Sequence, residues 1–198
     1  LHIGKDKDII RITNDAMNGK IDFKKALIER VAVLQGQPTE ILEKLKLSIN
    51  LNDGAIELIR TMKFNNAITV LVSGGFTFLT EHLKALLGFD YTHANSLEIS
   101  QDNLNNPHLT GKIINPILDK KAKVLYLDQY VNKNKLNYED TVCVGDGAND
   151  IEMIKKANLG VSFNGKEALD KEANIHFKNT NLLGLLYAQG YSDNQIIS

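Results

Sequence analysis

The segment Val144–Asp150, with the sequence Val-Gly-Asp-Gly-Ala-Asn-Asp, carries the residues of this chain that are best suited to chemistry. Asp146 directly follows an apolar run, and Asp150 comes four residues later at the start of an expected helix. Two carboxylates with Asn149 beside them offer only oxygen ligands, which suit Mg²⁺ far better than zinc. Mg²⁺ held by few protein groups usually also holds a phosphate. The alternative, that Asp150 only stabilises a helix N-terminus, leaves Asp146 unexplained, so we predict a site for Mg²⁺ and phosphate here.

A second polar turn, Val72-Ser-Gly-Gly-Phe76, follows an apolar run. We expect the strand to end at Ser73 and a helix to begin after the glycines. A hydroxyl followed by free backbone N–H groups at a helix N-terminus suits a phosphate oxygen, so Ser73 and Gly74 are candidate phosphate ligands. A nucleophilic serine elbow would need glycine two positions earlier, where Leu71 stands. The alternative is a purely structural turn.

Two cationic side chains remain open on the residues alone. Lys123 closes the run Lys120-Lys-Ala-Lys123, which fits a solvated helix face. It also fits a cation that stabilises the negative charge developing in phosphoryl transfer. Arg30 is one of three arginines. It either pairs with neighbouring acidic residues or holds a substrate carboxylate through its planar fork.

The elements that must position these side chains fall into two groups. Residues 6–47 show helical spacing throughout, with stops at Gly19 and Gly36. From residue 49 onward, apolar strands alternate with helices, and residues 91–114 resemble a β-hairpin. Strands that are apolar on both faces indicate a parallel sheet covered by helices, with the site beyond the carboxyl ends of the strands. The expected strands are 67–72, 141–144, 159–163 and 174–177.

Composition excludes several classes of function. With 198 residues, 43% of them hydrophobic and 24% charged, the chain fits one domain plus a small appendage and is not disordered. Because 23 basic and 24 acidic side chains give a net charge of -1, we expect no nucleic-acid partner. No apolar run approaches the ~20 residues of a membrane span. The single cysteine, Cys143, suits a reducing compartment, so we expect a cytoplasmic protein.

Taken together, these motifs resemble the haloacid dehalogenase (HAD) superfamily of phosphatases, and within it the phosphoserine phosphatases. The resemblance rests on five segments spread along nearly the whole chain: Ala16–Phe23, Leu27–Val31, Val72–Phe76, Leu109–Gly111 and Val142–Met153. It implies an α/β fold, with a Rossmann-like parallel core at residues 49–198 and a small, N-terminally truncated helical cap at residues 1–48. The implied reaction is Mg²⁺-dependent hydrolysis of a phosphomonoester through an aspartyl-phosphate. Phosphoserine is the implied substrate, and another small phosphate ester is the alternative.

The same resemblance assigns roles to nine residues that match the family's motifs. Ser73 and Gly74 would bind the phosphoryl group, Lys123 would neutralise it, and Asn149 would contact phosphate or a metal-bound water. Asp146 would ligate Mg²⁺, with Asp150 as its metal-site partner. In the cap, Arg30 would hold the substrate carboxylate, and Met17 and Phe23 would line the pocket.

One motif of the family has no match in these residues. Its Asp-x-Asp-x-Thr strand end supplies the nucleophilic aspartate and the general acid, whereas Asp6-Lys-Asp8 here enters an expected helix. We therefore expect the 198 residues by themselves to hydrolyse little phosphoserine. The alternative outside the enzyme class is a remnant that binds phosphate or Mg²⁺ without turnover.

In that family, the strand with the first motif lies between the strands that here end at Ser73 and Asp146. A gap of two strand spacings would leave unpaired backbone groups, each costing roughly 1–3 kcal/mol when buried. We expect the two flanking strands to pair directly, or residues 1–5 to close the gap. A strand from a second copy, in a homodimer, is the less favoured alternative.

Overall fold

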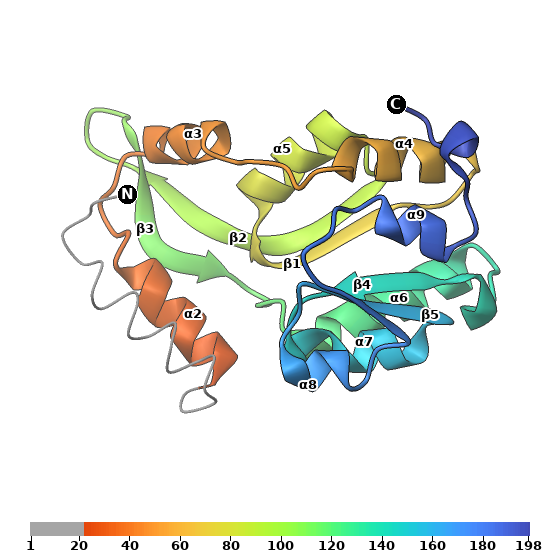
Figure 1. Cartoon of the computed structure of the whole chain (residues 1–198). Helices are drawn as coiled ribbons and strands as arrows, with labels where there is room; N and C mark the ends of the chain where they lie inside the picture. The colour runs from red at the N-terminus through yellow and green to blue at the C-terminus, as the bar shows by residue number, and fades with distance from the viewer. Residues whose placement is uncertain (1–21) are drawn as a thin grey trace. The chain divides into compact units, whose positions relative to one another are not determined.

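The structure is a computed structural model that describes residues 22–198 (Figure 1). Two compact units share the described chain. The described part of the first unit comprises residues 22–49, Gly75–His82 and Ala94–Ile117. The second unit comprises Asn50–Gly74, Leu83–His93 and Leu118–Ser198. The division expected between residues 48 and 49 stays a prediction.

A parallel three-stranded sheet forms the centre of the second unit. Its strands β4 (Val142–Gly145), β5 (Leu159–Phe163) and β6 (Ile175–Phe177) lie in the order β4-β5-β6. The short helices α7 (Ile151–Lys156) and α8 (Glu167–Asp170) connect them along the chain. This alternation of strand and helix confirms the α/β class and the expected parallel sheet.

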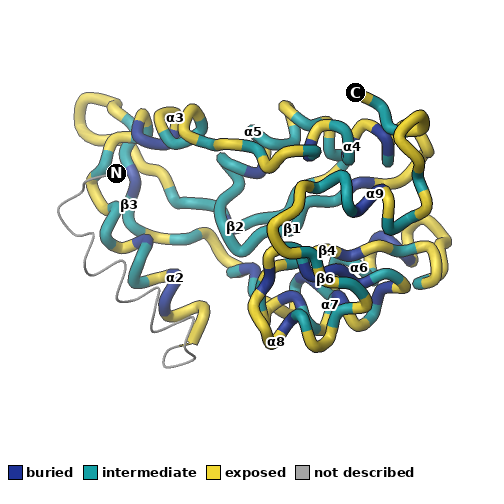
Figure 2. Tube along the Cα trace, viewed as in Figure 1, coloured by how far each residue is buried: buried dark blue, intermediate teal, exposed yellow. Residues whose placement is uncertain are grey.

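The packing of α7 against this sheet requires small residues on the strands. Ile154 and Leu169 are buried with Cys143 in one apolar cluster, and Figure 2 shows buried positions along α6, α7 and α8. A Cβ atom added at Gly160 would lie 2.4 Å from the Ile154 side chain. Glycine at this position therefore lets helix and strand approach closely.

Helix α6 (Lys120–Lys133) precedes β4 and confirms the expected long helix. The Asp119 side chain accepts hydrogen bonds from the Lys121 and Ala122 N–H groups at 2.9 and 3.3 Å, which caps the helix. Three 3₁₀ turns complete this unit: η1 (Tyr138–Asp140), η2 (Ala148–Asp150) and η3 (Asp193–Gln195).

Helices α4 (Ala55–Phe64) and α9 (Gly184–Ala188) are tied together in the second unit. The Leu182 N–H donates to the Asp53 carbonyl at 2.8 Å, just before each helix begins. Near the C-terminus, the Ile197 N–H donates to the hydroxyl of the buried Thr61 at 2.9 Å. The last residues of the chain are thus fixed to α4.

The first unit contains the helices α2 (Phe23–Ala32) and α3 (Glu40–Leu47), as expected. It also contains most of the antiparallel hairpin of β2 (Tyr91–Gln101) and β3 (Pro107–Ile114), which confirms the hairpin prediction. Its apolar cluster is formed by the buried residues Ile41, Leu42 and Leu109. The helix expected before Gly19 lies outside the described residues. No helix among residues 22–198 is long and apolar enough to cross a membrane.

The turn expected at Ser73-Gly-Gly is wrong. Strand β1 (Val70–Phe76) continues through both glycines, and α5 (Thr77–Leu87) begins only after Phe76. The reason is that β1 is hydrogen-bonded to β2. A ladder of backbone hydrogen bonds to a neighbouring strand outweighs the turn preference of the two glycines, whose permissive backbone also allows the extended conformation.

The expected direct pairing of the strands that flank the gap is also wrong, and the alternative, closure by residues 1–5, lies outside the described residues. β1 lies in the sheet β1-β2-β3, whereas β4 lies at the end of the sheet β4-β5-β6. β2 is the hydrogen-bonded neighbour of β1, and β5 offers β4 a parallel partner over its four residues. On β4, Val142 and Val144 remain 39% and 37% exposed.

Candidate active site

A buried ion pair joins the predicted cation to one of the predicted carboxylates. Lys123 lies in the first turn of α6, and Asp150 is the residue before α7. The Lys123 ammonium donates to Asp150 Oδ1, although the two residues are 27 positions apart. The side chain of Asp150 is 1% exposed and that of Lys123 is 11% exposed. Lys123 is therefore no part of a solvated helix face, because it points into the protein beside the predicted site.

The second oxygen of Asp150 holds the Asp146 loop, residues 145–150. Asp150 Oδ2 accepts the N–H of Asp146 at 3.2 Å and the N–H of Gly147 at 3.1 Å. A Cβ atom at Gly145 would lie 2.4 Å from the Asp150 side chain, so only glycine leaves room for the carboxylate. Gly145, the first glycine of the motif, thus leaves the space that the Asp150 side chain occupies.

The environment of Asp146 differs from that of the buried Asp150. It is exposed, and no hydrogen bond or ion pair from a described residue reaches its carboxylate. Asn149 is also exposed, with its side-chain oxygen close to Gly147. The sequence prediction that Asp146, Asp150 and Asn149 lie together is thus supported by the loop geometry, while their contacts with a metal or a phosphate stay predictions.

The oxygen atoms of the loop suit Mg²⁺ as ligands on one side of the ion. Asp146 offers an uncommitted carboxylate, and Mg²⁺ binds such oxygen ligands while keeping several waters. Asp150 already accepts three hydrogen bonds, so it has little remaining capacity as a direct ligand. Among residues 22–198, no three His, Cys, Asp or Glu side chains form a metal-binding group. A Mg²⁺ site at this loop stays a prediction, in which the described residues would supply only part of the ligands.

Cys143 lies directly behind this loop and takes no part in its polar contacts. Burial, together with the negative charge of Asp150, raises the pKa of its thiol to about 12. A thiol in this state remains protonated and unreactive near neutral pH. The prediction that Cys143 is a core residue is confirmed.

The other predicted ligands are placed differently. Ser73 and Gly74 lie within β1 and make interactions of their own, so they do not form a free helix N-terminus as expected. Arg30 and Phe23 lie on α2 in the first unit, with Arg30 in the last turn and Phe23 at the first position. Met17 lies outside the described residues.

One polar network near the loop was not predicted from the sequence. Ser162 on β5 is fully buried, and its hydroxyl donates to Asp170 Oδ1 at 2.6 Å. The other oxygen of Asp170 pairs with the Lys178 ammonium at 2.7 Å. The signal in the sequence is a serine inside the apolar run Leu159–Phe163, a position where a buried hydroxyl needs a partner.

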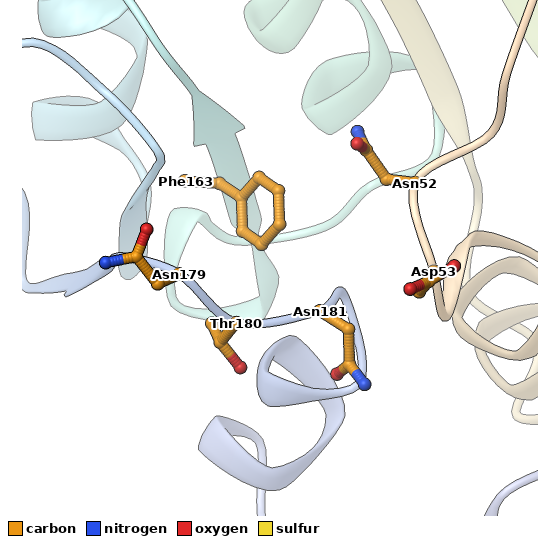
Figure 3. Close-up of a pocket in the computed structure, with 6 residues that line it drawn as sticks. All are labelled: Asn52, Asp53, Phe163, Asn179, Thr180 and Asn181. Carbon is orange, nitrogen blue, oxygen red and sulfur yellow. The ribbon is translucent and has the colours of Figure 1, made fainter.

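A cavity in the second unit is separate from these residues. It encloses about 480 Å³ in the second unit, and Figure 3 shows its lining. The lining residues are Asn52, Asp53, Phe163, Asn179, Thr180 and Asn181. All except Phe163 are polar and exposed, and none of these lining residues is a predicted site residue.

The comparison with protein families identifies the chain. Residues 7–155, well over half of the chain, match the model of the haloacid dehalogenase-like hydrolases. The chain belongs to this family. The resemblance read from Val142–Met153 and the other segments is thereby confirmed.

Curated relatives of this HAD-family chain include phosphoserine phosphatases. The one from Archaeoglobus fulgidus is 42% identical over 182 residues, which cover 92% of this chain and 52% of that protein. The one from Lactococcus lactis subsp. lactis is 42% identical over 183 residues, which cover 92% of this chain and 82% of that protein. The HAD-family chain thus spans about half the length of the first relative and most of the second.

Solved structures agree with the fold. The chain matches a phospho-aspartyl intermediate analogue of phosphoserine phosphatase with a TM-score of 0.84 and 36% identity, covering 94% of this chain and 87% of that one. It matches a substrate-bound phosphoserine phosphatase complex with a TM-score of 0.84 and 36% identity, covering 94% and 86% of the two chains. The HAD-like α/β fold predicted from the sequence is confirmed.

Proposed function

We propose that this chain carries the core of a Mg²⁺-dependent phosphoserine phosphatase. The observation that carries the proposal is the Asp146 loop, in which an exposed carboxylate stands beside a buried Lys123–Asp150 pair at the end of a parallel strand. The curated relatives that are 42% identical to the chain support phosphoserine as the substrate. Another small phosphate ester is the alternative substrate.

Asp146 is the residue that would hold Mg²⁺. When bound, the ion offsets negative charge on the phosphate and polarises a phosphoryl oxygen. The part played by the chain is to present the Asp146 carboxylate without a competing hydrogen bond from a described residue. Asp150 contributes by holding the backbone of the loop, since it accepts the N–H groups of Asp146 and Gly147.

Lys123 supplies the fixed positive charge of the proposed site. Its pairing with Asp150 restricts the ammonium to one position, so little reorganisation is needed when charge develops on a phosphoryl group. Asn149, exposed on the same loop, has a side-chain amide that can donate to a phosphate oxygen. Ser73 and Gly74 stay candidate phosphate ligands in the proposal, now as strand residues.

The substrate's amino-acid end is assigned to the first unit. Arg30, half-buried near the C-terminus of α2, has the bidentate fork that suits a carboxylate. Phe23 begins the same helix and is 39% exposed, which leaves its ring accessible as an apolar wall. Met17 is proposed as a further part of this wall.

The chemical step requires a nucleophile. The printed residues contain no Asp-x-Asp-x-Thr sequence, and losing a covalent nucleophile removes several orders of magnitude in rate. We therefore expect these 198 residues alone to bind phosphoserine and to hydrolyse it far below ordinary enzyme rates of ~1–10³ s⁻¹.

The test is phosphate release from L-phosphoserine, L-phosphothreonine and a simple aryl phosphate, with and without Mg²⁺. We expect slow, Mg²⁺-dependent release that is fastest with phosphoserine and is lost in Asp146→Asn. The matched control is Glu139→Gln, which removes an exposed carboxylate elsewhere in the same unit. Equal release from Asp146→Asn and the parent chain would contradict the proposed site, and a preference for another ester would favour the alternative substrate.

A further inference from the structure

The backbone of Asp146 is fixed at both of its polar atoms. Its N–H donates to Asp150 Oδ2 at 3.2 Å, and its carbonyl accepts the N–H of Lys166 at 3.0 Å. Its carboxylate, in contrast, receives no hydrogen bond from a described residue. The position of this carboxylate therefore depends on two supports, one from Asp150 and one from the Gly165 turn, residues 164–166.

The Gly165 turn is itself held by a chain of three side chains. The Lys178 ammonium donates to the Gly165 carbonyl and also pairs with Asp170 Oδ2 at 2.7 Å. Asp170 Oδ1 in turn accepts the hydroxyl of Ser162 at 2.6 Å. This network of Ser162, Asp170 and Lys178 runs from the buried strand β5 to the backbone of the turn.

The inner end of the network lies beside the Asp146 loop. Ser162 is fully buried and is paired in register with Gly145, the residue before Asp146. A buried hydroxyl must find a partner, and Asp170 is the partner here. The network therefore begins on the neighbouring strand, opposite the residue that precedes Asp146.

The turn fits tightly between the inner end of the network and the loop. A Cβ atom at Gly165 would lie 2.2 Å from Ser162 Oγ and 3.3 Å from the Asp146 carbonyl oxygen. Because the turn is in contact with both, a displacement of Gly165 changes the support of Asp146. In such a packed arrangement, small shifts are transmitted and not absorbed.

We propose that Ser162, Asp170 and Lys178 are positioning residues for the Asp146 carboxylate. They act through Gly165 and Lys166 and do not themselves contact the substrate. This inference rests on the proposed function only in the identity of the group that Asp146 binds. Residues that orient a ligand in this way typically affect metal affinity about 10–100-fold when they are removed.

Lys178 belongs to an exposed ion pair, so its effect on the Gly165 turn can be separated from its effect on global stability. The Lys178 side chain is 42% exposed, and such pairs contribute little to global stability. Lys178→Met should thus leave the unfolding midpoint nearly unchanged while loosening the Gly165 turn. The matched control is Lys171→Met, which removes an exposed lysine of the neighbouring pair with Glu167.

The first measurement is hydrogen exchange of the Lys166 amide by NMR in the full 198-residue chain. We expect exchange at least about 10-fold faster in Lys178→Met, because the turn opens locally. The Lys171→Met control should match the parent, and Lys178→Arg should stay close to it, since a guanidinium can reach both acceptors. Unchanged Lys166 exchange in Lys178→Met would overturn the proposal without reference to any metal or activity.

The second measurement is titration with Mn²⁺, followed by electron paramagnetic resonance as a probe of the Mg²⁺ site. We expect Mn²⁺ affinity to fall about 10-fold in Lys178→Met and to be lost in Asp146→Asn. If Asp146→Asn no longer binds Mn²⁺ but Lys178→Met binds it as tightly as the parent chain, the positioning inference is overturned. Parent affinity in Asp146→Asn, or no binding by the parent chain, would overturn the metal role in the proposed function, while Lys166 exchange still decides the positioning role.

Discussion

Replacing Asp150 by alanine removes the central interaction of the second unit. The Asp150 side chain is 1% exposed and pairs with Lys123, whose side chain is 11% exposed. The variant leaves the Lys123 ammonium buried without its partner. It also frees the N–H groups of Asp146 and Gly147, which lie on an accessible loop and can bond to water.

The expected loss of stability follows from this burial. Breaking a buried ion pair by removing one partner costs about 3–5 kcal/mol. With a urea dependence of roughly 2 kcal/mol per molar for a chain of this size, the unfolding midpoint should fall by about 1.5–2.5 M. A domain stable by ~5–15 kcal/mol would lose a large part of its margin.

Cys143 provides the assay. It is the only cysteine, it is buried against Ile154, and its thiol reacts only when this part of the unit opens. Pulsed labelling with a thiol reagent at increasing urea therefore reports unfolding at the site itself. The matched control is Glu152→Ala, which breaks the nearby pair between Lys120 of α6 and Glu152 of α7. That pair spans 3.9 Å with both side chains 59% exposed, and its removal should cost under about 1 kcal/mol.

Two outcomes bear on the reasoning. If Asp150→Ala shifts the midpoint no further than Glu152→Ala does, the buried pair does not hold the loop, and the account of the site is refuted. If the shift is large, the double variant Lys123→Met, Asp150→Leu should recover much of the stability. An apolar pair replaces a buried ion pair at little cost, whereas an unpaired charge does not.

Three further predictions test other parts of the structure. In the native state, Cys143 should react with thiol reagents orders of magnitude more slowly than a free thiol at pH 8, because its pKa is raised to about 12; fast labelling without denaturant would contradict this. Burial opposes ionisation of Asp90, but hydrogen bonds from Lys63 and Thr69 outweigh it and lower its pKa below 3.8. The ionised Asp90 therefore stabilises the fold fully above its unfolded pKa, and this stabilisation is lost as pH falls through the lower folded pKa. Between pH 6 and 3, the free energy of unfolding should thus fall less in Asp90→Asn than in the parent chain. An equal fall in both proteins would contradict this prediction. Gly165→Ala should destabilise the chain through its clash with Ser162 Oγ, and Ser162→Ala in the same chain should relieve it in thermal melts, so a Gly165→Ala variant as stable as the parent would show that no clash exists.

The sequence allowed the class of fold and the position of the loop to be predicted. Val142–Val144 is a short apolar run before a polar glycine turn, and such runs, separated by helices, indicate parallel strands. Asp146 and Asp150 could be predicted because both lie within a few residues of that strand end. Local spacing was sufficient for these assignments.

Contacts between distant residues were beyond such reasoning. Lys123 could be singled out, but its pairing with Asp150 depends on how α6 packs against α7. The network of Ser162 and Lys178 depends in the same way on the order of β5 and β6. Ser73 was misplaced because hydrogen bonding between β1 and β2 is non-local and overrides the preference of the two glycines for a turn.

The most direct test of the proposed function is a calorimetric titration of the 198-residue chain with L-phosphoserine, with and without Mg²⁺. The account predicts binding that requires Mg²⁺, is lost in Asp146→Asn and is retained in Glu139→Gln. Binding of equal strength in the parent and Asp146→Asn, or the absence of binding to the parent with Mg²⁺ present, would contradict the claim that the Asp146 loop is a site for Mg²⁺ and phosphate.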